Sequence, residues 1–127
     1  DDSTAATTAT AANNHARIRV AYSSNSGANW TVVTPHSTAN QNTVDRFHPW
    51  IGVGPNGRVQ LAYYDTTRSA ARTSVDLVHQ TSTDGGATWA RFGTGLPLVN
   101  VTDFYISPDS SLARISTFGR GFWDLIP

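Results

Sequence analysis

The sequence predicts an all-β protein made of antiparallel strands joined by tight turns. Residues 17–22 alternate polar and apolar side chains, which is the period of a strand with one buried face. The Asn-Gly pair at 56–57 lies between two apolar runs and is a strong signal for a β-hairpin. A Ser-x-Asx-x-Gly-x-x-Trp pattern occurs at 23–30 and again at 82–89, so one structural unit is expected to recur along the chain.

The repeated motif has the chemistry of a turn. The Asp84 carboxylate can accept hydrogen bonds from backbone N–H groups of the turn, and the glycines beside it tolerate positive φ angles. Asn can replace Asp because its side chain bonds the backbone in the same way. The motif residues expected to be structural are Ser23, Asn25, Gly27, Trp30, Ser82, Asp84, Gly86 and Trp89.

The strands are expected to follow one another between these turns. The Ala/Thr-rich residues 1–16 are expected to be a disordered or linker-like segment before the folded part, residues 17–127. Polar loops are expected at 35–48, 65–74 and 93–100. The expected strands are 17–22, 31–34, 50–53, 58–64, 75–81, 90–92, 101–106, 112–118 and 121–126.

The two turn motifs resemble the Asp-box of the bacterial-neuraminidase-type repeat, which occurs in sialidases and many other β-propeller proteins. The resemblance implies antiparallel four-stranded β-propeller blades, about two and a half of them: two strands of one blade, a complete second blade and three strands of a third. It also implies that Trp30, Trp89 and Trp123 lie in the cores of the blades. The ending TFGRGFWDL is similar to the end of many bacterial Asp-box propellers.

A partial propeller leaves exposed strand edges and apolar faces, because ring closure takes about four or more blades. We therefore expect the chain to be the C-terminal portion of a longer protein, or to close a ring with other subunits. A small β-sandwich that contains such turns is the structural alternative. The sequence begins at Asp1, without an initiator Met or a signal-peptide pattern, and we expect a processed or excised piece of a secreted or extracellular protein.

Composition narrows the chemistry. The chain has no Cys, Lys or Glu, so a thiol nucleophile, a Schiff-base lysine and a glutamate acid/base pair are absent from these 127 residues. The formal net charge is zero and no long apolar run occurs, so neither nucleic acid nor a membrane is the expected partner. No cofactor is expected, and the spacing of Asp and His matches no metal motif.

Up-and-down strands place alternate loops at opposite ends of a sheet. One end is expected to gather most of the ionisable loop residues, among them His36, Asp45, Arg72 and Arg120. Functional groups commonly lie on such loops, and Arg next to Asp or His suits a carboxylate or polar ligand. The substrate-binding candidates are Arg46, His48, Trp50, Tyr64, Asp65 and Arg68.

Structural roles for the same residues remain open. Asp65 capping a turn and pairing with Arg68, and His48 packing as a ring, explain the pattern equally well. Sialidases use an arginine cluster, an Asp acid/base and a Tyr nucleophile activated by Glu, and this chain lacks both the Glu and the Phe/Tyr-Arg-Ile-Pro motif. Catalytic residues are therefore not assigned.

The leading hypothesis is recognition or hydrolysis of a glycan or another small polar ligand. The alternatives are a non-enzymatic propeller scaffold for interaction or assembly, and a processed C-terminal appendage of another secreted enzyme.

Overall fold

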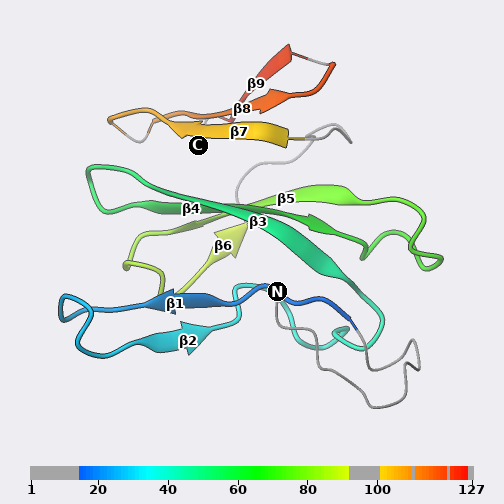
Figure 1. Ribbon diagram of the computed structural model, residues 1–127, viewed down its shortest axis with the longest axis horizontal. Helices are drawn as coiled ribbons and strands as arrows, with labels where there is room; N and C mark the ends of the chain where they lie inside the picture. Colours follow the sequence, from blue (N-terminus) through cyan, green and yellow to red (C-terminus); the bar gives the residue numbers. More distant parts are fainter. Residues whose placement is uncertain (1–14, 92–100, 110, 120, 126–127) are drawn as a thin grey trace.

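A computed structural model describes residues 15–91, 101–109, 111–119 and 121–125, which form three antiparallel β-sheets and no helix (Figure 1). The expectation of an all-β protein is confirmed. The first sheet has two strands, β1 (Val20–Tyr22) and β2 (Thr31–Val33). The second has four in chain order and the third has three: β3 (Arg46–Val53), β4 (Val59–Asp65), β5 (Asp76–Ser82), β6 (Ala90–Arg91), β7 (Val101–Ile106), β8 (Ala113–Thr117) and β9 (Gly121–Leu125).

Strand β3 begins four residues earlier than its sequence predicts. Arg46 pairs with Asp65 and Phe47 pairs with Tyr64, so the end of the expected loop 35–48 belongs to the sheet. The register then shifts between Phe47 and Trp50. His48 has a φ of 56° in this bulge, and the proline that follows has no N–H to offer the ladder. The polar sequence of this strand start explains why it was expected to be a loop.

The three sheets are stacked face to face in chain order, with the four-stranded sheet in the middle (Figure 1). Every residue of β4 is buried because both faces of its sheet are covered. Leu61, Tyr63 and Val78 pack on one face with Ile18 and Val20. On the other face, the cluster consists of Ala62, Tyr64, Leu77 and Ile115, with Phe47, Trp50, Val75 and Phe104 packed against it.

Strand direction places the two motif turns and the β3–β4 and β7–β8 turns at one end of the stack, and the 34–45 and 66–75 connections and the β8–β9 turn at the other, as expected (Figure 1). At the turn end, Val53 pairs with Val59 and Val59 with Ser82. At the opposite end, Asp65 lies between Arg46 and Asp76 in the ladder. We call these the turn end and the loop end.

The two motif turns have the same hydrogen bonds. In the second, the Ser82 hydroxyl donates to Asp84 (2.7 Å) and accepts from the Gly86 N–H (2.8 Å), and the indole N–H of Trp89 donates to the Gly86 carbonyl (2.9 Å). In the first, Ser23, Asn25, Gly27 and Trp30 make the corresponding contacts at 2.9, 2.9 and 3.1 Å. Gly27 and Gly86 have φ angles of 87° and 104°, as such turns require.

Burial of the motif tryptophans differs from what the sequence predicts. Trp89 is partly buried against the core, but the exposed fraction is 63% for Trp30 and 38% for Trp123. The prediction that all three are core residues is therefore wrong for Trp30 and Trp123. The physical reason is position: these two lie in the outer sheets of the stack, whereas Trp89 lies beside the middle sheet, which has a neighbour on each face.

The described part of the chain begins inside the segment expected to be a linker. His15 is buried, its Nδ1 lies 3.0 Å from Asp45 Oδ1, and the Ala16 N–H donates to the same oxygen at 3.0 Å. Arg72 Nη1 lies 3.3 Å from the other carboxylate oxygen of Asp45. This cluster fixes the start of the fold against the loop end. The remainder of the expected linker, 1–14, and the expected loop 93–100 lie outside the described residues.

Candidate functional site

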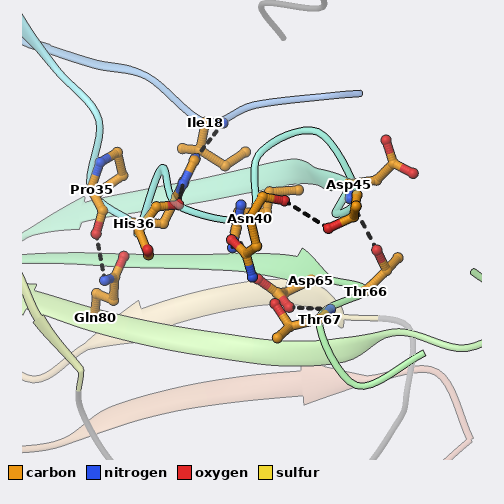
Figure 2. A network of polar contacts seen from close by, with 12 residues as sticks. Ile18, Pro35, His36, Asn40, Asp45, Asp65, Thr66, Thr67 and Gln80 are labelled. Carbon is orange, nitrogen blue, oxygen red and sulfur yellow. Dashed lines mark hydrogen bonds and ion pairs between the residues drawn. The ribbon is translucent and has the colours of Figure 1, made fainter. Parts of the chain in front are cut away.

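A cavity of about 270 Å³ lies at the loop end, on the face of the middle sheet that packs towards β1. Alternate residues of neighbouring strands form its floor, because side chains two apart point to the same face. Figure 2 shows residues of the 35–40 loop on one side and residues of β4 and β5 on the other. The cavity is lined by residues that include His36, Asn40, Arg46, Tyr63, Asp65, Arg68, Asp76, Gln80 and Arg91.

A buried ion pair anchors the cavity. The Arg46 Nε donates to Asp65 Oδ2 at 2.8 Å, and both side chains are less than a tenth exposed. Arg46 Nη2 donates to the Asn40 side-chain oxygen at 2.9 Å, and the Thr67 N–H donates to Asp65 Oδ1 at 2.6 Å. The remaining Arg46 nitrogen, Nη1, is buried without a partner among the described residues. A buried donor in this state costs about 1–3 kcal/mol until it is satisfied.

Gln80 supplies a matching unsatisfied acceptor. Its Nε2 donates to the Pro35 carbonyl at 2.6 Å, which fixes the orientation of the amide because a carbonyl can only accept (Figure 2). The Oε1 atom is then buried with no hydrogen-bond partner in the described part of the chain. Arg46 and Gln80, which both line the cavity, therefore each have one buried polar atom without a partner among the described residues.

His36 links the roof of the cavity to the chain entering β1. Its Nδ1 lies 3.1 Å from the Ser37 carbonyl and its Nε2 accepts from the Ile18 N–H at 3.3 Å, which together describe a neutral ring protonated on Nδ1. Burial lowers the pKa of His36, in agreement with the neutral form. The ring lies 6.1 Å from that of Tyr63, whose pKa burial raises to about 12. Both groups are therefore uncharged at neutral pH.

The rim of the cavity is charged and open. Arg68 forms a two-point ion pair with Asp76 through its Nε and Nη2 atoms. This contact lowers the pKa of Asp76, so the carboxylate stays ionised. Arg91 of β6 is exposed and adds a further cation, giving the cavity three arginines against two aspartates. The Arg68 side chain is 81% exposed, so a ligand can displace it at little cost.

The six substrate-binding candidates are divided between two faces of the middle sheet. Arg46, Asp65 and Arg68 meet at the cavity. His48, Trp50 and Tyr64 lie on the opposite face, where the ring centroids of His48 and Trp50 are 4.3 Å apart and Trp50 packs edge-on against Tyr64 at 5.6 Å. The six candidates were expected to form one cluster, but they form two clusters on opposite faces of the sheet. Adjacent residues of a strand point to opposite faces, so Tyr64 and Asp65 cannot serve one site.

Sequence reasoning did not single out Tyr63, Asp76, Gln80 or Arg91 as binding residues. Asp76 and Gln80 lie in β5, and their ladder partners Asp65 and Leu61 share the face with Tyr63. Side chains alternate between the two faces along β4 and β5, so a known register would have identified the residues that share the face of the cavity. Register was not available from the sequence, because both faces of β4 are apolar enough to be buried.

In the described residues, no group of three or more His, Cys, Asp or Glu side chains is arranged to hold a metal ion. No helix of the described chain could span a membrane. The candidate site is a polar cavity lined by arginine, aspartate, glutamine and aromatic side chains.

Comparisons with other proteins add no assignment. No family model, no curated protein and no solved structure matches this chain.

Proposed function

We propose that this chain is a glycan-directed portion of an Asp-box β-propeller protein and that it binds a saccharide in the loop-end cavity. One observation carries the proposal: hydrogen-bond donors and acceptors, among them Arg68, Arg91 and Gln80, line one cavity together with two aromatic rings. A sugar hydroxyl both donates and accepts, so a polyhydroxylated ligand suits a cavity with both kinds of group in its walls. The two rings are those of Tyr63 and His36, which are uncharged at neutral pH.

The equivalent bonding of the two motif turns and the stacking of separate antiparallel sheets support the propeller part of the proposal. In this reading, the first sheet is the outer half of a blade, the middle sheet is a complete blade and the third sheet lacks its last strand. The remaining blades come from a longer chain or from other subunits. Secretion is part of the same proposal.

The cavity favours recognition over hydrolysis. Glycosidases commonly need one protonated carboxyl group as the general acid. Here Asp65 is paired with Arg46, and Asp76 is held ionised by Arg68. The Asp76 carboxylate therefore does not retain the proton that a general acid needs, and the Asp65 carboxylate is already engaged by Arg46.

Binding of the purified chain to a glycan array tests the proposal. Arg68→Ala and Arg91→Ala change exposed rim residues and should weaken binding to the best array ligand by about 10-fold each, the effect of roughly 1.4 kcal/mol. Arg114→Ala is the matched control, since Arg114 forms the same two-point pair with Asp124 in the third sheet. Absence of any array ligand, or equal losses in all three variants, would count against a saccharide site in this cavity.

A second candidate, an assembly scaffold, is favoured by a different observation. Large apolar side chains remain exposed on the outer sheets and on β3, including Val32, Val53, Phe118 and Phe122 at 54–80% exposure. Contiguous exposed apolar surface is typical of contact surfaces for other protein segments. The mass of the native particle separates a monomer from an assembly.

A further inference from the structure

The turn end of the molecule has a second hollow, which the saccharide proposal does not use. It has a volume of about 440 Å³ and is lined mainly by apolar groups of β1, β3 and the two motif turns. We call it the turn-end groove. Val20 and Val59 are buried at its base, and Trp30, Ile51 and Val53 are exposed along it.

The repeat within the chain indicates which strands would fill the groove. β1 and β2 flank the first motif turn as β5 and β6 flank the second, and both turns are bonded alike. β5 pairs on its other edge with β4, which in turn pairs with β3. Within the described residues, β1 pairs with β2 alone. In the part of the chain that the structure describes, the first sheet therefore has no counterparts of β3 and β4.

The packing of β3 shows what those counterparts would cover. On one face, β3 contacts β7, and Gly52 lies so close to Ile106 that an added Cβ would be 2.7 Å from Ile106 Cδ1. β7 occupies the same first position in its sheet as β3 does. On the other face, Ile51 and Val53 are 56% and 68% exposed. By the same stacking, a first strand of the β1–β2 sheet would lie over these two side chains.

We infer that the turn-end groove binds an antiparallel β-hairpin, supplied by another polypeptide segment. Its second strand pairs with the open edge of β1, and its first strand packs apolar side chains on Ile51 and Val53. The groove continues the core between the first two sheets, formed by Ile18, Val20 and Leu61, so the hairpin would extend an existing interface. Backbone pairing to a strand edge gives affinity, and alternate side chains give specificity. The inference rests on the propeller part of the proposed function.

The probe is a synthetic peptide of residues 46–65, the native β3–β4 hairpin, which is the internal counterpart of the missing pair. Titration of the labelled peptide up to about 1 mM against the intact chain should give saturable binding. Hydrogen exchange should slow at the amides of Val20–Tyr22 in the complex, because these would enter a ladder. A peptide of scrambled sequence should not bind.

Ile51→Lys and Val53→Lys place a charge on exposed groove positions and should weaken peptide binding at least 10-fold. Tyr105→Lys is the control, because Tyr105 is 50% exposed in the third sheet, away from the groove. No binding up to 1 mM, or equal binding to all three variants, overturns the inference. A concentration-dependent dimer that Ile51→Lys abolishes would instead assign the groove to a second copy of the chain, and would overturn it as well.

Glycan binding of the two groove variants is measured in parallel. The cavity and the groove are at opposite ends of the middle sheet, so Ile51→Lys should leave glycan binding unchanged. A result that concerns peptide binding therefore bears only on the groove. A result that concerns glycan binding bears only on the cavity.

Discussion

Arg46 and Asp65 face each other across the β3–β4 ladder, and their side chains form a buried ion pair with an Nε–Oδ2 distance of 2.8 Å. The pair joins the start of one strand to the end of the next at the point where the cavity begins. Its burial makes it sensitive to the loss of either partner, since one uncompensated charge would remain inside the protein.

Asp65→Ala should lower the free energy of unfolding by about 3–5 kcal/mol, the typical cost of breaking a buried ion pair. The double variant Arg46→Met with Asp65→Leu should lose less than the sum of its single changes, because no lone charge is left. Urea denaturation provides the measurement. Arg114→Ala, at an exposed pair, should cost no more than about 1 kcal/mol. If the loss in the double variant equals the sum of the losses in the two single variants, the two charges do not interact.

The free energy of unfolding should fall as the pH falls below about 6.5, the ordinary pKa of His36. Burial lowers the pKa of this group in the folded state, so the unfolded chain binds more protons in that range. Protonation of Nε2 would also break the bond it accepts from the Ile18 N–H. His36→Gln should flatten this part of the profile of stability against pH. An unchanged slope in the variant would contradict the assignment.

Asp84 gives an acid-side prediction at the second motif turn. Hydrogen bonds from the Thr88 hydroxyl and N–H, and from Ser82, hold the pKa of this carboxyl well below its usual range. The corresponding stabilisation is present above the unfolded pKa of about 3.8 and is lost as the pH falls through the lower folded value.

Asp84→Asn should remove that loss on acidification while keeping the turn, because Asn25 makes the corresponding bonds in the first turn. The reciprocal change, Asn25→Asp, should introduce a loss of stability on acidification at the first motif turn. Thermal unfolding at pH 7 and near pH 3 compares the variants. Equal acid sensitivity of the wild-type chain and Asp84→Asn would rule out a contribution from this carboxylate.

Contact between the second and third sheets is tested at Gly52. Gly52→Ala puts a methyl group 2.7 Å from Ile106 Cδ1 and should cost about 1–3 kcal/mol through overpacking. Ile106→Val removes that same carbon, so the double variant should lose less than the two single changes combined. Denaturant titration of the four proteins gives the coupling energy, and a value near zero would mean that the two sheets separate easily here.

The sequence predicted the local elements well. Turn chemistry at 54–57 and 82–89 and the alternation of the flanking runs located most strands to within one or two residues, because both depend on neighbours in the chain. The start of β3 was missed since Arg46, Phe47, His48 and Pro49 have no strand-like alternation, and only pairing with Tyr64 and Asp65 makes them part of a sheet.

By itself, the amino-acid sequence determined that the chain forms antiparallel hairpins, that its two Ser-Asx-Gly-Trp turns are built alike, and that polar loops gather at one end. Tertiary structure alone decided which side chains share a face. It separated Arg46 and Asp65 from Trp50 and Tyr64, and it left Trp30 exposed while Trp89 is partly buried. The physical reason is that a strand alternates its faces with every residue, and only register and the stacking of sheets decide what each face meets.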